Sequence, residues 1–311
     1  MIKILKNIPL KKHTSFKIGG KAKHFVKAKS NKDIIDAITW AKTNKTRYFV
    51  LGSGTNVLFS EKGYNGLIVK IFRQKIGKTN DGYIYCSAGT EMKRAVNFFS
   101  KNSFAGIEWA GGLPGTAGGA VRGNAGAFLG EIKDSVAKVE SLNCMKTPPV
   151  LVTRTNKECK FAYRDSIFKH NDEIITAVWF KAEKGKKNKI TEKIKSCKAY
   201  RNKYQPLEYP SAGSFFKNIP LKSVSAAVKK EFSSVIKNDP FPLIPAAAVT
   251  DRLGLKGKLY KGAQISPKHP NFLINKKNAS FKSVLLLANL IKSKALQKFR
   301  IKMIPEVQII K

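Results

Sequence analysis

Two glycine-rich stretches of the sequence could bind phosphate groups. The first, VLGSGTNVL, follows an apolar run and carries Gly52 and Gly54. The second, AGGLPGTAGGAVRGNAGAFLG, runs from Ala110 to Gly130 and contains one charged residue, Arg122. Glycine has no Cβ, so its backbone N–H groups can turn towards an anion and approach it closely. Interleaved alanine and valine distinguish the second stretch from a flexible glycine–serine linker.

The first stretch differs from the two common nucleotide-binding motifs. Val57 stands where a dinucleotide fingerprint has its third glycine, and no helix pattern follows. No lysine followed by serine or threonine closes the loop, so it is not a P-loop. The alternative for the second stretch is a set of tight turns without a ligand. Two such stretches in one chain favour a ligand with a pyrophosphate and a long body, held from two sides.

Hydrophobic periodicity predicts the helices and strands that position these stretches. The first helix is expected over 30–44, beginning at Ser30 or Asn31. The other helices are expected over 90–102, 188–204 and 283–301, and the strands over 47–59 (interrupted by the glycine turn), 66–72, 82–89, 135–144 and 172–182. The segment QPLEYPSAGS marks a domain junction. The mixed order indicates an α+β fold with segregated domains and not a regular βαβ alternation.

The composition indicates a globular protein with an excess of lysine. The 311 residues carry a formal net charge of +39, yet nine of the 59 basic residues are arginine. Arginine is the residue that makes paired contacts with bases and phosphates, and the lysines are dispersed along the chain. We therefore expect a lysine-rich surface and no nucleic-acid partner. A basic nucleic-acid-binding protein is the alternative from a different functional class.

The sequence also bears on membranes, metals and compartment. No apolar run approaches the roughly 20 residues that cross a bilayer. The N-terminus is too short and too interrupted for a secretory signal. The four cysteines are scattered without the spacing of a zinc site. We therefore expect no membrane partner, no metal and a reducing cytoplasmic setting. The sequence does not determine the oligomeric state, for which a monomer is favoured.

A series of motifs, in order along nearly the whole chain, resembles the UDP-N-acetylenolpyruvoylglucosamine reductase (MurB) family. The segment GIEWAGGLPGTAGGAVRGNAGAFLGEI resembles its central signature, and LGSGTNVLF resembles its first flavin loop. HTSFKIGGKAKHF, FAYRDSIFK, RNKYQPLEYPSAGSFFKN, DRLGLKGKLYKGAQISPKHPNFLIN and PEVQII complete the set. Any one of these motifs is suggestive, whereas the ordered series is specific.

The resemblance implies a two-lobed FAD-binding fold of the vanillyl-alcohol-oxidase (PCMH) type, followed by a C-terminal α+β substrate-binding domain. It implies a first lobe at 1–70 with 304–311 returning to it, a second lobe at 71–205, and the substrate-binding domain at 206–303. The implied cofactor is non-covalent FAD, with NADPH as the reductant. The implied reaction converts UDP-N-acetylglucosamine enolpyruvate, a nucleotide sugar, to UDP-N-acetylmuramate for peptidoglycan synthesis.

The resemblance also assigns roles to single residues. Ser214 matches the proton donor of the family, Arg164 the residue that stabilises the enolate, and Glu306 the third catalytic position. Apart from the family, Ser214 is equally a turn serine, and Arg164 pairs with Asp165 at the surface. The residues implied to bind FAD are Gly52, Ser53, Gly54, Thr55, Asn56, Gly115, Thr116, Gly118, Gly119, Asn124 and Ala125. Those implied to bind the substrate are Tyr163, Lys217, Asn218 and His269, with Asn271 a weaker candidate.

The sequence departs from the family pattern at a few places. Thr55 replaces a serine that is common in the first flavin loop, and the segment 219–244 is longer than expected. PAAAVTDRLGLKG differs from the usual motif of its position. The short connection between FAYRDSIF and DEIITAVWF leaves no room for the tyrosine loop of the longer subgroup, so the chain resembles the shorter subgroup. An FAD-dependent oxidase of the same fold, acting on an alcohol or sugar, is the alternative enzyme.

Overall fold

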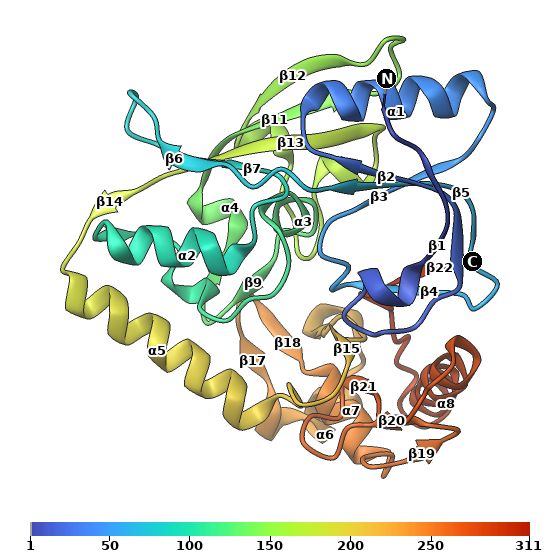
Figure 1. Cartoon of the computed structure of the whole chain (residues 1–311). Coiled ribbons are helices and arrows are strands. Elements are labelled where there is room, and N and C mark those ends of the chain that lie inside the picture. The colour runs from blue at the N-terminus through green and yellow to red at the C-terminus, as the bar shows by residue number, and fades with distance from the viewer. Residues whose placement is uncertain (1) are drawn as a thin grey trace. The chain divides into compact units, whose positions relative to one another are not determined.

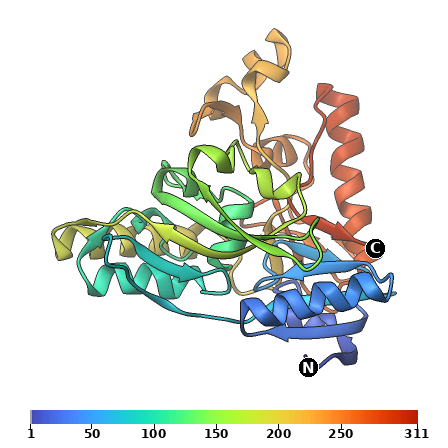
Figure 2. The ribbon, with the colours of Figure 1, turned by 90° about the horizontal axis from the view of Figure 1, so that it is seen from above.

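A four-stranded sheet near the N-terminus carries a helix on one face (Figures 1 and 2). The structure, a computed structural model, describes residues 2–311. The strands lie in the order β1 (Leu5–Pro9), β2 (Lys21–Ala28), β5 (Tyr64–Ile71) and β3 (Tyr48–Leu51), and β2, β5 and β3 are parallel. The helix α1 (Asn31–Thr43) is capped by Ser30, which exchanges hydrogen bonds with Asp33. Its apolar residues recur every three or four positions and are buried against the sheet.

A five-stranded antiparallel sheet follows in the order β12, β11, β13, β7 and β6. Its strands are β6 (Ile76–Lys78), β7 (Ile84–Ser87), β11 (Val136–Asn143), β12 (Val150–Thr155) and β13 (Glu173–Phe180). The helices beside it are α2 (Met92–Lys101), α3 (Ala117–Arg122) and α4 (Ile132–Ser135). Two short strand pairs are β8 (Phe104–Ala105) with β14 (Glu183–Lys184) and β9 (Gly126–Ala127) with β10 (Gly130–Glu131). Apolar residues of both sheets and these helices form one core.

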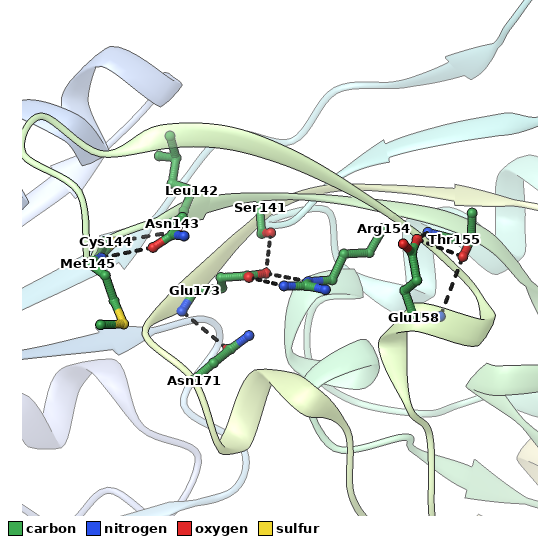
Figure 3. A network of polar contacts seen from close by, with 10 residues as sticks. All are labelled: Ser141, Leu142, Asn143, Cys144, Met145, Arg154, Thr155, Glu158, Asn171 and Glu173. Atoms are coloured by element: carbon green, nitrogen blue, oxygen red, sulfur yellow. Dashed lines mark hydrogen bonds and ion pairs between the residues drawn. The ribbon is translucent and has the colours of Figure 1, made fainter.

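An ion pair joins strands of the five-stranded sheet (Figure 3). Arg154 on β12 donates through Nε to Glu173 on β13 at 2.8 Å, and Ser141 on the intervening β11 donates to the same carboxylate at 2.7 Å. The Arg154 guanidinium holds the pKa of the Glu173 carboxyl below its usual value, against the opposing effect of burial. A buried carboxylate is tolerated when it is paired and hydrogen-bonded, so this network fixes the pairing of three strands.

The chain separates into two compact units. The first contains the described residues up to Ile8, Ala22–Ser53 and Tyr64–Tyr200, and the second contains Pro9–Lys21, Gly54–Gly63 and Arg201–Lys311. The boundary falls within the last turn of α5 (Lys187–Tyr204). Each unit has its own hydrophobic core.

The second unit contains short strands and three helices. Its four-stranded sheet has the order β15 (Ser211–Ser214), β21 (Phe272–Asn275), β20 (Ala263–Ile265) and β19 (Leu259–Tyr260). A three-stranded sheet has the order β16 (Ile219–Pro220), β18 (Pro242–Ile244) and β17 (Lys237–Asn238), and β22 (Gln308–Ile310) pairs in parallel with β4 (Val57–Phe59). The helices are α6 (Ala226–Glu231), α7 (Ala246–Arg252) and α8 (Phe281–Phe299). α8 buries Val284, Leu287, Ile291 and Ala295 in the core of this unit.

The sequence predicted the long elements well and the short ones poorly. Each of the four predicted helices lies within two residues of its predicted bounds. The long segment 219–244 forms the three-stranded sheet together with α6, which periodicity did not reveal. The division into domains at 1–70 (with 304–311), 71–205 and 206–303 stays a prediction. The two compact units have other bounds, since each combines segments that are far apart in the sequence. Among residues 2–311, no helix has the length and apolar character needed to cross a membrane.

Candidate active site

The first glycine loop (52–56) begins where β3 ends. A Cβ on Gly52 would lie 2.6 Å from the Thr116 hydroxyl oxygen, so this position admits glycine alone. Lys70, on the neighbouring strand β5, donates from Nζ to the carbonyl of Gly52 at 3.1 Å. The start of the loop is therefore fixed within the first unit by a side chain of the second glycine stretch and by a lysine.

The remainder of the first glycine loop belongs to the second unit. Gly54 has a φ of +72°, and a Cβ there would lie 2.2 Å from the carbonyl oxygen of His13. Asn56 donates from its side chain to the carbonyl of Glu306 at 3.2 Å and accepts from the N–H of Gln308 at 3.0 Å. The loop is thus attached to the C-terminal segment that carries a predicted catalytic residue.

Several backbone N–H groups of the two stretches are available to an anion. Within residues 2–311, the N–H groups of Ser53, Gly54, Thr55 and Asn56 donate no hydrogen bond, and neither do those of Gly115 and Thr116. Backbone N–H groups without a protein partner are the donors that a diphosphate requires. Ser53, Gly115 and Thr116 lie in the first unit, and the other three lie in the second. Within each unit, the free N–H groups are of the kind that can bind a phosphate.

Most glycines of the glycine tract (110–130) face protein. A Cβ on Gly118 would lie 2.8 Å from the Cβ of Ala88, and one on Gly130 would lie 2.4 Å from the ring of Trp109. Gly119 differs, because its nearest neighbour would be the Thr116 hydroxyl oxygen at 3.3 Å. The N–H groups of Gly118 and Gly119 donate to Ala88 and to Thr116. Close packing therefore explains much of the glycine content.

Asn124 has a structural role within the glycine tract. Its side chain is fully buried, accepts from the N–H of Lys133 at 3.0 Å and donates to the carbonyl of Ala162 at 2.9 Å. The N–H of the next residue, Ala125, donates to the carbonyl of Ala120. The Asn124 amide therefore joins the glycine tract to the segment before Arg164, and a cofactor contact by this residue stays a prediction.

Arg164 lies at the tip of a tight turn in the first unit. Ala162 and Asp165 exchange backbone hydrogen bonds at 3.1 Å, and Arg164 has a φ of +53°, a region that side chains other than glycine rarely adopt. Its Nη2 donates to the carbonyl of Gly126 at 2.8 Å, and its guanidinium lies 5.2 Å from the ring centroid of Tyr163. Strain of this kind often marks functional positions, so the turn holds the guanidinium in a defined place.

The Asp165 carboxylate has its own partners. The ring of His170 lies 2.8 Å from it, and the N–H of Ser166 donates to it at 2.9 Å. Burial acts to raise the pKa of Asp165, but the hydrogen bonds from His170 and Ser166 lower it below its usual value. Asp165 is therefore ionised and anchors the turn next to Arg164.

Ser214 and Glu306 are brought together within the second unit. Ser214 ends β15, and the N–H of Glu306 donates to the carbonyl of the next residue, Phe215, at 2.8 Å. Two residues further on, Lys217 donates from its N–H to the carbonyl of Ile304 at 2.9 Å. These contacts pair 214–217 with 304–307, although the two segments are far apart in the sequence.

Asn271 maintains this pairing and does not face a ligand. Its side chain is 3% exposed, donates to the carbonyl of Phe216 at 2.9 Å and accepts from the N–H of the same residue at 3.0 Å. Substrate binding by Asn271 stays a prediction, and its amide is already used within the protein. Asn218 accepts from the N–H of Ala246 at 3.1 Å, at the start of α7.

His269 lies in the second unit as a neutral ring. Burial lowers the pKa of His269 to about 4, and its ring packs against Phe272 with centroids 4.8 Å apart. Its backbone N–H donates to the buried hydroxyl of Ser266 at 3.2 Å. A neutral imidazole supplies no positive charge to a diphosphate, so a substrate contact by His269 would be a hydrogen bond.

Two residues of the first unit were missed by sequence reasoning. Lys70 contacts the first glycine loop, and the buried Glu131 lies 3.9 Å from Arg164 and forms an ion pair with Lys133 at 2.8 Å. The signal for Lys70 was a lysine inside the apolar strand GLIVKIF. Glu131 carried no such signal, because one acidic residue after a glycine is ordinary.

Comparisons with known proteins show the family and the domains of the chain. A family model described as the C-terminal domain of UDP-N-acetylenolpyruvoylglucosamine reductase matches residues 205–310, and an FAD-binding-domain model matches residues 22–146. The reductase of Caldanaerobacter subterraneus subsp. tengcongensis is 36% identical over 308 residues, which cover 99% of this chain and 94% of the relative. That of Caldicellulosiruptor bescii is 35% identical over 311 residues, which cover 99% and 91%.

A solved structure shares the whole fold. The crystal structure of UDP-N-acetylenolpyruvylglucosamine reductase (MurB) from Thermus caldophilus superposes with a TM-score of 0.77 at 24% identity, over 100% of this chain and 99% of that one. The expected α+β architecture, an FAD-binding fold of the vanillyl-alcohol-oxidase type with a C-terminal domain, is confirmed. By its identity to these relatives over nearly its whole length, the chain belongs to the FAD-dependent UDP-N-acetylenolpyruvoylglucosamine reductase family.

Proposed function

We propose that this protein reduces UDP-N-acetylglucosamine enolpyruvate to UDP-N-acetylmuramate with FAD as cofactor and NADPH as reductant, in peptidoglycan precursor synthesis. Membership of the reductase family over nearly the whole chain supports this reaction. The alternative, an FAD-dependent oxidase of the same fold, is less supported, because the relatives that match over almost all of the chain are reductases.

The reaction sets two requirements for the side chains. FAD, when bound, supplies the hydride that goes to the methylene carbon of the enolpyruvyl ether. Negative charge then develops on the substrate as an enolate conjugated with its carboxylate, and a proton must reach the neighbouring carbon. The protein must therefore provide a proton donor and groups that stabilise the enolate.

Ser214 is the proposed proton donor, and its pairing with the Glu306 segment is the observation that carries the proposal. The two residues lie on adjacent hydrogen-bonded segments of the second unit. Within residues 2–311, the Ser214 hydroxyl makes no hydrogen bond, so it remains available to a substrate. A serine hydroxyl is a weak acid, but an enolate carbon is a strong base, and correct placement is sufficient.

Arg164 is the proposed stabiliser of the enolate, and Glu306 is proposed to form a hydrogen bond with the carboxylate of the intermediate. The turn at Ala162 and Asp165 supports the role of Arg164, because it fixes the guanidinium before a substrate binds. A guanidinium can meet a carboxylate with two parallel hydrogen bonds. Tyr163, Lys217, Asn218 and His269 are proposed substrate-binding residues.

Separate measurement of the two half-reactions tests the role of Ser214. In Ser214→Ala, NADPH should bleach the flavin at the normal rate, because the hydroxyl takes no part in that step. Reoxidation by the enolpyruvyl sugar should slow at least about a hundredfold, the usual contribution of a general acid. Stopped-flow absorbance follows both steps. A variant that reoxidises as fast as the parent enzyme excludes Ser214 as the donor.

Arg164→Lys tests the paired contact. A lysine ammonium keeps the charge but cannot present two parallel donors, so reoxidation should slow about tenfold or more. Flavin reduction by NADPH should be unchanged in the same stopped-flow experiment. Equal reoxidation rates for the variant and the parent would show that Arg164 has another role.

The cellular setting is also part of the proposal. We infer a cytoplasmic monomer that prefers NADPH over NADH and supports cell wall biogenesis, cell shape and cell division through the cell cycle. Within residues 2–311, the four cysteines are buried and form no disulfide, which is typical of a reducing compartment. Burial also raises the pKa of Cys86 to about 12, so this thiol stays protonated. Light scattering during size exclusion tests the monomer, and initial rates with both nucleotides test the preference.

A further inference from the structure

Lys70 is a partly buried lysine that the proposed chemistry does not use. It lies near the C-terminal end of β5, in register with Lys27 on β2 and with Leu51 on β3. The paired residues of neighbouring parallel strands point to the same face of the sheet. Val26 and Val69, one residue earlier on each strand, belong to the core that α1 covers. Lys27 and Lys70 therefore lie on the face away from α1.

The ammonium of Lys70 is directed at the first glycine loop. Its Nζ donates to the carbonyl of Gly52 at 3.1 Å, and within residues 2–311 it forms no ion pair with a carboxylate. Burial lowers the pKa of Lys70, the charge of Lys27 lowers it further, and Glu91 opposes both effects. A partly buried cation without an ion-pair partner is unfavourable unless something else compensates for it.

The parts of the two glycine stretches that lie in the first unit meet next to the Lys70 ammonium. Gly52 adjoins the hydroxyl of Thr116, and Thr116 forms a backbone bridge with Glu91. Within residues 2–311, the N–H groups of Ser53, Gly115 and Thr116 have no protein partner. Lys70, which is bonded to the carbonyl of Gly52, places a cation at the start of this group of donors.

We propose that Lys70 is a cofactor-positioning residue, which holds the carbonyl of Gly52 and adds the positive charge that the neighbouring N–H groups need to bind the diphosphate of FAD. The inference rests on the proposed function, which requires FAD. The C-terminal ends of parallel strands commonly bind such ligands, and a fixed ammonium stabilises phosphate more than neutral donors do. The diphosphate in turn compensates for the buried charge.

The release of FAD from the purified holoenzyme on dilution tests this role. Free FAD is more fluorescent than bound FAD, so the dissociation constant is measured without catalysis. Lys70→Met, which keeps the length of the side chain without its charge, should raise the dissociation constant at least about tenfold. Lys70→Gln should do the same, since it keeps a hydrogen-bond donor but no charge. Lys70→Arg should remain within about threefold of the parent.

Lys27→Met is the matched control. Lys27 lies in register with Lys70 on the same face but is exposed, so its loss should change the dissociation constant less than about threefold. Raising the ionic strength about tenfold should weaken FAD binding in the parent more than in Lys70→Met, because salt screens the ammonium.

Specific results would overturn the inference. FAD affinity of Lys70→Met or Lys70→Gln within about twofold of the parent would remove Lys70 from cofactor binding. An equally large loss of FAD affinity in Lys70→Arg or Lys27→Met would show that the charge of Lys70 does not determine FAD binding. A parent protein that is purified without flavin and takes up no added FAD would instead contradict the proposed function, so the two failures are distinguishable.

Discussion

The first glycine loop and the glycine tract look alike in sequence but differ in what their backbones contact. In the first glycine loop, the N–H groups of Ser53 to Asn56 have no protein partner within residues 2–311. In the glycine tract, the N–H groups from Ala117 to Ala120 all donate to protein atoms. The tract is nevertheless much richer in glycine. A high glycine content therefore indicates close packing, whereas unpaired N–H groups indicate that a loop can bind an anion.

This difference divides the predicted FAD-binding residues into two groups. Within residues 2–311, six of them have free N–H groups (Ser53, Gly54, Thr55, Asn56, Gly115 and Thr116), and four do not (Gly118, Gly119, Asn124 and Ala125). Gly52 belongs to neither group and is described by its contacts with Thr116 and Lys70. The glycines of the second group can still shape the cofactor site, because they have no side chain that would fill it. Substitutions in the glycine tract should therefore change stability where a glycine meets protein, and cofactor affinity where it faces open space.

Gly130→Ala should give the largest effect on stability. A Cβ at this position would lie 2.4 Å from the ring of Trp109, which is 5% exposed and cannot move without disturbing the core. Overpacking of this kind should lower the free energy of unfolding by about 3 kcal/mol. Urea denaturation of the holoenzyme followed by tryptophan fluorescence measures it. Gly77→Ala is the control, because a Cβ there meets nothing within 4 Å and should change stability little. Gly82→Ala is unsuitable as a control, because Gly82 has a φ of +86°.

Asn124→Ala should give the next largest effect. The substitution leaves the N–H of Lys133 and the carbonyl of Ala162 without their partner, which should lower the free energy of unfolding by about 2 kcal/mol. The folded fraction should bind FAD with unchanged affinity, because the amide faces the protein interior. Asn102→Ala is the control: this exposed amide donates to Phe98 at 2.8 Å, and its loss should matter less. Weaker FAD binding with unchanged stability would restore Asn124 as a cofactor ligand.

How well the sequence predicted an element depends on how far apart in the sequence its interacting residues lie. Long helices such as α1 and α8 have local caps and periodic apolar residues, so their bounds were predictable. Short strands such as β15 and β21 exist because residues far apart in the sequence pair with each other, which no local pattern encodes. The family resemblance supplied Ser214, Arg164 and Glu306, but their local geometry required the structure.

At three positions the sequence could not show which atoms the side chain contacts. Asn124 and Asn271 are polar residues inside conspicuous motifs, and their amides are used to satisfy buried backbone groups. Lys70 was overlooked because it lies in a strand whose remaining residues form the core. Sequence patterns reveal which residue types are present, whereas the direction of each side chain depends on tertiary contacts.

Gly118→Ala and Gly119→Ala form the matched pair that tests the comparison most directly, with the smallest expected effects. Both residues lie in α3, where alanine is a better helix former than glycine. At Gly118 the new Cβ would lie 2.8 Å from that of Ala88, so stability should fall by about 1.5 kcal/mol. At Gly119, the nearest atom is the Thr116 hydroxyl oxygen at 3.3 Å, which must shift slightly and offsets the better helix propensity, so stability should change by less than about 0.5 kcal/mol.

FAD affinity should respond in the opposite order, because a Cβ at Gly119 would meet only the Thr116 hydroxyl oxygen, whereas one at Gly118 would meet the side chain and backbone of Ala88. Gly119→Ala should release FAD more readily on dilution although its stability is little changed, and the folded fraction of Gly118→Ala should retain FAD like the parent. Urea denaturation and flavin fluorescence on the same preparations give both quantities. Loss of FAD from Gly118→Ala alone would mean that packing at Ala88, and not the missing side chain at Gly119, determines the shape of the cofactor site.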